Sequence, residues 1–232
     1  MRKKRRFDLR RSFRIVKRTE ISNSKSEQQN QQVKIMKKLV LYGDSNTYGY
    51  DPRGFMGMRY PEDVRWASLI EQKLQGKYEV INEGMNGRPL PDIKWDGQFI
   101  DRVVSGLSED DILIMMLGTN DILLTDRPDA RVAIRKMENI LSYTKLTQGS
   151  FEFIVIAPVY IGLPDGEMSR YYDESVKMNE EFGNLCEAKN VRFTDAGKWN
   201  IPLAYDLAHF SEEGHKIFAE KLMEELDSEV VL

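Results

Sequence analysis

A serine and a histidine that lie far apart in the sequence are the residues best suited to catalysis. Ser45 follows an apolar run that ends at Gly43, and its hydroxyl becomes a strong nucleophile only when a base removes its proton. His209 is one of only two histidines in the chain, and an imidazole can take and return a proton near neutral pH. Asp206 precedes it by three residues, a spacing that lets a carboxylate orient the imidazole. These residues predict a Ser-His-Asp triad for acyl transfer.

Acyl transfer also needs hydrogen-bond donors for the negative oxygen that develops on the substrate carbonyl. The backbone N–H of Ser45 is one candidate donor. Gly84 can offer a second backbone N–H, because glycine has no side chain to block a close approach. Asn120 can offer its side-chain amide. We therefore predict an oxyanion hole formed by Ser45, Gly84 and Asn120.

Each of these residues also has a simpler structural interpretation. Ser45 could cap the helix expected after it, and Asn120 could close an Asx turn. Asp206 and His209 could form a polar pair within their loop. The four residues come from loops that the fold is expected to bring to one rim, and this coincidence favours the catalytic interpretation.

For three other polar residues we favour a structural role. Asp44 is expected to be a buried hydrogen-bonding residue that shapes its loop rather than a second base. Asp121 is expected to cap a helix. His215, the second histidine, falls in the first turns of the last expected helix, where packing or capping is the more natural role.

Five short apolar runs are expected to form the strands that position the site. The runs are continuous rather than alternating, which is typical of strands buried on both faces. Amphipathic helical periods between them require crossovers, and crossovers make the strands parallel. The expected strands span residues 38–42, 78–82, 111–117, 151–157 and 191–195, and the expected helices span 66–74, 128–147, 169–189 and 211–226. The prediction is a flavodoxin-like α/β fold, a three-layer α/β/α sandwich with a five-stranded parallel sheet, whose ligands bind beyond the carboxyl ends of the strands.

Composition narrows the class of protein. The chain has 232 residues, of which 41% are hydrophobic, enough for the core of one domain. The single cysteine, Cys186, excludes a disulfide framework and a cysteine-rich zinc site. We expect no metal and no cofactor, because the sequence has no clustered His/Cys ligand set and the proposed triad needs none. No run of about eighteen apolar residues occurs, so no transmembrane helix is expected.

The first 35 residues differ in charge from the remainder. Residues 1–35 carry twelve Lys or Arg and three Asp or Glu, a net charge of +9, whereas the remaining chain carries 22 basic and 34 acidic residues, a net charge of −12. This segment is expected to be a basic, disordered extension ahead of a domain over residues 36–232. It lacks the apolar core of a secretory signal, so no export by that route and a cytoplasmic location are expected.

Three interpretations of this extension stay open. It could be an unstructured tail, or a stretch upstream of a true start at Met36. It could instead bind anionic membrane or RNA. The third interpretation is that it folds onto the domain. The net charge of the whole chain is −3, which excludes an obligate nucleic-acid binder driven by overall charge. No nucleic-acid partner is therefore required.

Four motifs occur in an order that resembles the SGNH hydrolases, also called GDSL-like esterases. They are GDSNT at 43–47, the glycine loop at 84, GTND at 118–121 and DLAH at 206–209. The resemblance covers residues 36–232. It implies that Ser45, Gly84, Asn120 and His209 are the four residues after which the family is lettered, and that Asp206 completes the triad.

Two further motifs are similar to the arylesterase and acyltransferase branch of that family. They are RYPEDVRW at 59–66 and YEVINEGMNGR at 78–88. The similarity implies small acyl esters as substrates, acyl transfer to alcohols in some members, and assembly into a homo-oligomer. Asn46 stands where the family's name has leucine, and Tyr48 where this branch often has tryptophan, so the pocket wall is expected to differ.

The sequence as a whole predicts a serine esterase for small, short-chain, acetyl-type esters that works through an acyl-enzyme. A small-molecule ester is the expected partner. Tyr48, Met85 and Trp95 are expected to bind the substrate, and Trp199 is a further candidate for either the pocket wall or the core. Two other functions stay open: a carbohydrate O-acetyl deacetylase, and a non-catalytic flavodoxin-like binding protein.

Overall fold

The fold is known from a computed structural model, which describes residues 36–54 and 58–229. The predicted extension over residues 1–35 lies outside the described residues. None of the helices within the described ranges is both long enough and apolar enough to cross a membrane.

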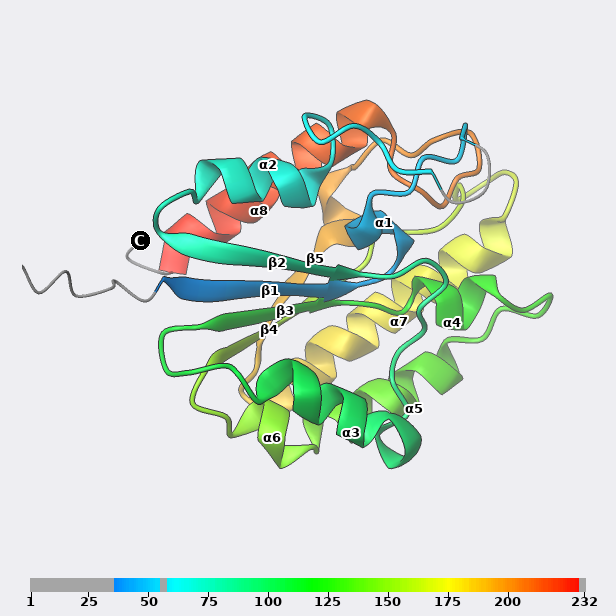
Figure 1. Cartoon of the computed structure of the whole chain (residues 1–232). Helices are drawn as coiled ribbons and strands as arrows, with labels where there is room; N and C mark the ends of the chain where they lie inside the picture. The colour runs from blue at the N-terminus through cyan, green and yellow to red at the C-terminus, as the bar shows by residue number, and fades with distance from the viewer. Residues whose placement is uncertain (1–35, 55–57, 230–232) are drawn as a thin grey trace, which may run out of the picture. The chain divides into compact units, whose positions relative to one another are not determined.

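Five parallel strands form a single sheet in the order β2-β1-β3-β4-β5 (Figure 1). This confirms the predicted five-stranded parallel sheet. The strand β2 continues to Gly84, two residues beyond its predicted end. The strands are β1 (Lys37–Gly43), β2 (Tyr78–Gly84), β3 (Ile112–Met116), β4 (Glu152–Ala157) and β5 (Arg192–Asp195).

Helices cover both faces of the sheet, which confirms the three-layer α/β/α sandwich. In Figure 1, α2 (Trp66–Lys73) and α8 (Glu212–Glu229) lie on one side of the sheet. The other side carries α3 (Ile93–Val104), α5 (Ala130–Leu141), α6 (Thr144–Thr147) and α7 (Ser169–Ala188).

Each face of the sheet has its own hydrophobic core, because side chains alternate along a strand. Leu39 and Leu41 of β1 pack with α2 and α8, whereas Val40 and Tyr42 pack with α3, α5 and α7. All five residues of β3 are buried, as expected for a strand covered on both sides.

The structure corrects the helix prediction in two places. The helix α3 is not among the predicted helices, because Gly97 in its interior lowers its helical propensity. The helix predicted over residues 128–147 is divided into α5 and α6 at Ser142 and Tyr143.

Three short helical segments lie at the carboxyl ends of the strands. These are α1 (Ser45–Tyr48) after β1, α4 (Thr119–Leu123) after β3, and the 3-10 helix η1 (Ala196–Trp199) after β5. The helix α8 begins after Ser211, whose Oγ accepts the Gly214 N–H at 3.0 Å. Ser211 is therefore the N-cap of this helix.

Candidate active site

The serine after β1 sits at the start of a helix but does not cap it. The cap of α1 is Asp44, whose Oδ1 accepts the Asn46 N–H at 2.9 Å. The capping interpretation of Ser45 is therefore wrong, and its hydroxyl is not used by the helix that it begins. Asp44 is 1% exposed and shapes this loop, as predicted.

Ser45, His209 and Asp206 form a continuous chain of short polar contacts. Ser45 Oγ lies 2.9 Å from His209 Nε2, and His209 Nδ1 lies 2.6 Å from Asp206 Oδ2. Residues 45 and 209 are 164 positions apart in the sequence, so only the fold brings these side chains together. The arrangement has the geometry needed for the imidazole to take a proton from the serine while the carboxylate holds its other nitrogen.

The Asp206 carboxylate also organises its own turn. Its Oδ1 accepts the backbone N–H groups of Ala208 at 3.2 Å and His209 at 3.0 Å. Leu207, which directly follows Asp206, adopts a left-handed φ of 56°, and its carbonyl accepts the Gly162 N–H at 2.8 Å. The turn thus places the His209 imidazole against the Asp206 carboxylate.

Hydrogen bonds keep the Asp206 carboxyl ionised. Burial acts to raise the pKa of Asp206, but the hydrogen bonds from the His209 side chain and backbone and from the Ala208 N–H outweigh it. The pKa consequently lies below the ordinary value for aspartate. The negative charge of the Asp206 carboxylate is therefore present beside the His209 ring when that ring accepts a proton.

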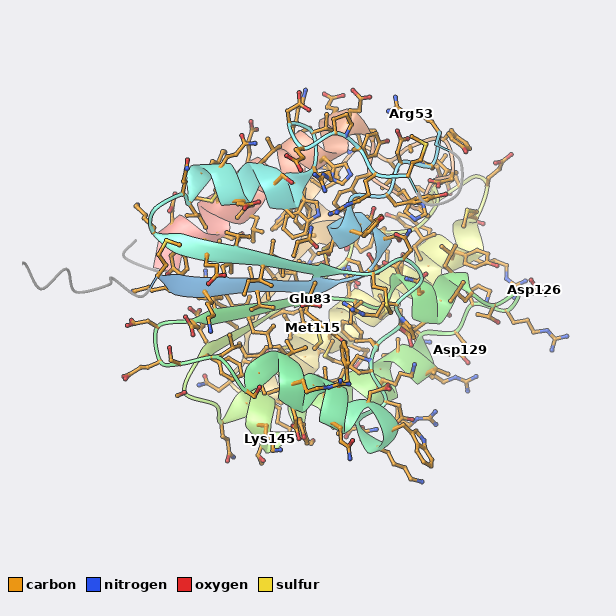
Figure 2. All side chains as sticks on the ribbon, viewed as in Figure 1. Arg53, Glu83, Met115, Asp126, Asp129 and Lys145 are labelled. Atoms are coloured by element: carbon orange, nitrogen blue, oxygen red, sulfur yellow. The ribbon has the colours of Figure 1, made fainter. Side chains whose placement is uncertain are left out.

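A tyrosine ring covers the imidazole on another side. The ring of Tyr50 lies with its centroid 4.7 Å from that of His209, at an interplanar angle of 56°. The loop that carries Tyr50 also carries Arg53, which Figure 2 labels. The Arg53 guanidinium pairs with Asp51 at 2.9 Å and with Glu212 at the start of α8 at 2.7 Å. The pair with Glu212 joins the loop to the helix that follows His209.

The buried Asp44 carboxyl makes the stability of the protein depend on pH. Burial raises the pKa of Asp44 to about 6, although the hydrogen bond from the Asn46 N–H and the charges of His209 and Arg88 oppose this. The folded state therefore binds this proton more tightly than the unfolded chain does. Proton binding by Asp44 therefore contributes fully to the free energy of unfolding below about pH 4. This contribution, on the order of 3 kcal/mol, is lost as the pH rises through about 6.

Asp44→Asn tests this linkage, because an asparagine keeps the cap and has no charge to bury. We expect the variant to gain stability relative to the wild type at pH 7.5 but not at pH 4. Denaturant unfolding of both proteins at the two pH values measures the difference. An equal difference at both values would contradict the buried ionisation of Asp44.

Asn120 lies in the first turn of α4 with its side chain largely buried. Its Nδ2 donates to the Arg88 carbonyl at 3.0 Å, so it does not close an Asx turn within its own loop. An amide nitrogen carries two hydrogens, and this contact uses one of them. The second N–H is available for another acceptor. The structure thus ties Asn120 to the loop that follows β2.

Gly84 does not have the free N–H that the sequence analysis assigned to it. Its N–H donates to Asn82 Oδ1 at 2.8 Å, and the Asn82 amide in turn donates to the Thr47 carbonyl at 3.0 Å. A Cβ at Gly84 would lie 2.2 Å from the Tyr48 backbone nitrogen. Gly84 is therefore a place of close contact between β2 and α1, which corrects the prediction that it donates to an oxyanion.

Gly87, on the loop after β2, is a further candidate donor that the sequence analysis does not name. The Met85 N–H donates to the Gly43 carbonyl at 3.1 Å, and the Arg88 carbonyl accepts from Asn120, so residue 87 lies between the Ser45 loop and Asn120. Its φ is +72°, and a Cβ there would meet nothing within 4 Å. Within residues 36–54 and 58–229 no acceptor meets its N–H. The sequence signal for this residue is the second glycine of the GMNG segment at 84–87.

The predicted substrate-binding residues have different surroundings. Tyr48 ends α1, and the guanidinium of Arg59 lies 4.3 Å from its ring centroid. Met85 is 50% exposed and directly follows β2, at the rim beside the Ser45 loop. Trp95 is 75% exposed on the first turn of α3 with Lys94 over its ring, and no contact among the described residues joins it to the triad. The structure therefore does not support Trp95 as a wall of this site.

The remaining candidates are structural. Trp199 packs on Phe218 beneath α8, with ring centroids 5.2 Å apart, and so belongs to the core. His215 is fully buried, which confirms its packing role, and burial together with the nearby Arg65 charge lowers its pKa to about 3.

Asp121 is not the helix cap that the sequence analysis expected. One of its oxygens accepts the Leu90 N–H at 2.7 Å, and the other pairs with Lys136 at 2.8 Å. It therefore joins the loop before α3 to α5. In the described part of the chain no group of three His, Cys, Asp or Glu side chains is arranged to hold a metal ion.

Comparisons with solved structures find esterases of the same architecture. A putative arylesterase from Agrobacterium tumefaciens str. C58 is 25% identical, with a TM-score of 0.68 over 84% of this chain and 100% of that one. The native M. smegmatis aryl esterase is 23% identical, with a TM-score of 0.68 over 84% and 100% of the two chains. A carbohydrate acetylesterase from Sinorhizobium meliloti is 22% identical, with a TM-score of 0.67 over 83% and 99%.

Sequence comparison identifies the family. A search of curated protein sequences finds no match. The model of the GDSL-like lipase/acylhydrolase family, by contrast, matches residues 41–217, which include the end of β1, Ser45 and the loop with His209. The match spans well over half of the chain, and the arylesterase structures share its fold. This chain therefore belongs to the GDSL-like lipase/acylhydrolase family and is a hydrolase of ester bonds.

Proposed function

We propose that the protein is a serine esterase that cleaves small esters with short, acetyl-type acyl groups through an acyl-enzyme on Ser45. The observation that carries the proposal is the pair of contacts that join Ser45 Oγ to His209 at 2.9 Å and His209 to Asp206 at 2.6 Å. A nucleophile, a base and an orienting group in that order make up the device by which serine hydrolases work.

The proposed reaction has two halves. In the first, His209 Nε2 accepts the hydroxyl proton as Ser45 Oγ attacks the ester carbonyl, and the imidazolium then gives this proton to the departing alcohol oxygen. In the second, His209 takes a proton from water, the resulting hydroxide attacks the acyl-enzyme, and the proton returns to Ser45 as the carboxylic acid leaves. A second alcohol in place of water would give acyl transfer.

Three donors are proposed to stabilise the oxyanion in each half. Ser45 offers its N–H at the first position of α1, where no helical carbonyl can accept it. Gly87 offers a backbone N–H on the side of Asn120, and Asn120 offers the amide hydrogen that Arg88 does not use. Gly87 thereby takes the role that the sequence analysis gave to Gly84.

The burial of the nucleophile supports a short acyl group. Ser45 is only 6% exposed and Asn120 is equally buried, which favours a small acyl group at this point. Tyr205, the neighbour of Asp206, is by contrast 74% exposed. The Tyr205 hydroxyl donates to the Pro52 carbonyl at 2.6 Å, which fixes an exposed ring beside the triad.

That exposed ring favours a second candidate function, a carbohydrate O-acetyl deacetylase. A sugar ring could stack on Tyr205 while its acetyl group reaches Ser45. The carbohydrate acetylesterase from Sinorhizobium meliloti has the same fold, which is compatible with this substrate class.

Covalent labelling followed by a substrate panel tests these proposals. A fluorophosphonate should modify Ser45, whereas a non-catalytic binding protein would stay unlabelled. The panel compares nitrophenyl acetate, butyrate and octanoate with acetylated sugars, and adds an alcohol acceptor to detect acyl transfer. Faster turnover of octanoate than of acetate would contradict the short-chain proposal, and a clear preference for acetylated sugars would favour the deacetylase.

Asn120→Ala is expected to lower kcat for nitrophenyl acetate by about 10²–10³, the usual effect of removing one oxyanion donor. Steady-state kinetics measures this loss. Asn179→Ala is the matched control, since Asn179 is also buried and donates to the Pro158 carbonyl and to Asp195, away from the triad. An unchanged kcat in Asn120→Ala would remove the amide from the oxyanion hole.

A further inference from the structure

Asn46 follows the proposed nucleophile but does not face the substrate. It is 3% exposed, so the expectation that it changes the pocket wall is wrong. The side chain points instead to the loop that carries His209, which is 162 to 164 residues further along the chain. The residue thus connects the two loops that supply the nucleophile and the base.

Both polar atoms of the Asn46 amide bind backbone groups on either side of His209. Its Nδ2 donates to the Ala208 carbonyl at 3.1 Å, and its Oδ1 accepts the Phe210 N–H at 2.9 Å. Ala208 is 4% exposed and Phe210 is fully buried. Because these backbone groups are buried, water can replace a lost hydrogen-bond partner only if the backbone moves.

The backbone of Asn46 is itself held on two sides. Its N–H donates to Asp44 Oδ1 at 2.9 Å, and its carbonyl accepts the indole N–H of Trp66 at 2.8 Å. Trp66 is 1% exposed and packs on Phe218 in the core under α8. The amide that holds the His209 loop is therefore anchored to the rigid interior rather than to another loop.

We propose that Asn46 is a positioning residue that sets the distance between Ser45 Oγ and His209 Nε2. The inference rests on the proposed function, because that distance matters only if the imidazole takes the serine proton. A side chain of similar size without hydrogen-bonding atoms would leave the Ala208 carbonyl and the Phe210 N–H without partners. The segment between them would shift and carry the imidazole away from the serine.

The contact between His209 and Asp206 should survive such a shift. Asp206 binds the side chain and backbone N–H of His209 and the N–H of Ala208, all within one turn. The turn can move as a unit, so loss of Asn46 should weaken the Ser45–His209 contact selectively. General damage to the loop would weaken both contacts.

Asn46→Leu is the test, with Asn46→Ala as a second variant if the leucine prevents folding. We expect kcat for nitrophenyl acetate to fall about 10- to 100-fold, because a misplacement near 1 Å costs up to this much. KM should stay within about twofold, since the substrate pocket is not altered. Labelling of Ser45 by a fluorophosphonate should slow by a similar factor, while the low-field proton NMR signal of the His209–Asp206 hydrogen bond persists.

Asn179→Leu is the control for loss of a buried amide elsewhere, and its kcat should match the wild type even if its thermal midpoint falls. Unchanged kcat in the Asn46 variants, or loss of the low-field signal together with activity, would overturn the inference. Absence of labelling in the wild type would instead refute the proposed function. A labelled wild type beside an equally reactive Asn46→Leu would refute the positioning role alone.

Discussion

Ser45→Ala is expected to lower kcat for nitrophenyl acetate by about 10⁶-fold, the size of loss that follows removal of a serine nucleophile. The hydroxyl is the group that would form the acyl-enzyme, and no other hydroxyl forms a hydrogen bond with the His209 ring within the described ranges. The thermal midpoint should change little, because Asp44 rather than Ser45 caps α1. Initial rates and fluorophosphonate labelling measure the effect.

Ser175→Ala is the matched control for this substitution. Ser175 is 1% exposed, and its Oγ donates to the Tyr172 carbonyl at 2.8 Å and accepts the Ile161 N–H at 3.1 Å. Its loss should cost stability of about 1–3 kcal/mol without changing kcat. If Ser45→Ala kept more than a few per cent of the wild-type kcat, the serine would have no place in the mechanism.

The sheet could be predicted because its signal is local. The residues of β3 form an apolar run with polar residues at its start, and burial on both faces requires such a run. Polar loops after successive strands then had to meet at one rim, because parallel strands present their carboxyl ends on the same side. The contact between Ser45 and His209 is a consequence of that topology.

The identity of the donor after β2 could not be predicted, because it depends on the residue at which the strand ends. An end at Asn82 puts Gly84 in the loop, whereas β2 pairs with β1 as far as Gly84. The strand ends two residues later than predicted, and the proposed donor is Gly87, three residues beyond Gly84. The residue at which a strand ends is set by pairing with the neighbouring strand. The β-propensities of the residues around Asn82 do not reveal that residue.

The role of Asn46 is a second property that only the fold reveals. An asparagine after a serine at a helix start indicates a capping or turn residue from sequence alone. Its partners at Ala208 and Phe210 come from the other end of the chain, and both are backbone groups, which carry no sequence signature. The missed α3 has a different cause, since Gly97 in its interior lowers the helical propensity of the segment.

Asp206→Asn is expected to lower kcat by about 10⁴-fold while leaving the fold intact. Asp206 Oδ1 accepts two backbone N–H groups, from Ala208 and His209, and only a carbonyl oxygen can replace it there. The amide nitrogen of the new side chain must therefore face His209 Nδ1. It would donate to that nitrogen and keep the imidazole proton on Nε2, where the ring cannot accept the proton of Ser45.

The matched control is Asp195→Asn, the same change in a similar turn. Asp195 Oδ1 accepts the Gly197 N–H at 3.0 Å, just as Asp206 accepts backbone donors, but it faces Asn179 and Tyr160 rather than a histidine. Steady-state kinetics and thermal unfolding of both variants separate the tautomer effect from damage to the turn. Wild-type kcat in Asp206→Asn would show that His209 needs no carboxylate to select its tautomer. A loss of kcat in Asp206→Asn alone, with both turns intact, would show that the carboxylate acts by fixing the nitrogen on which His209 carries its proton.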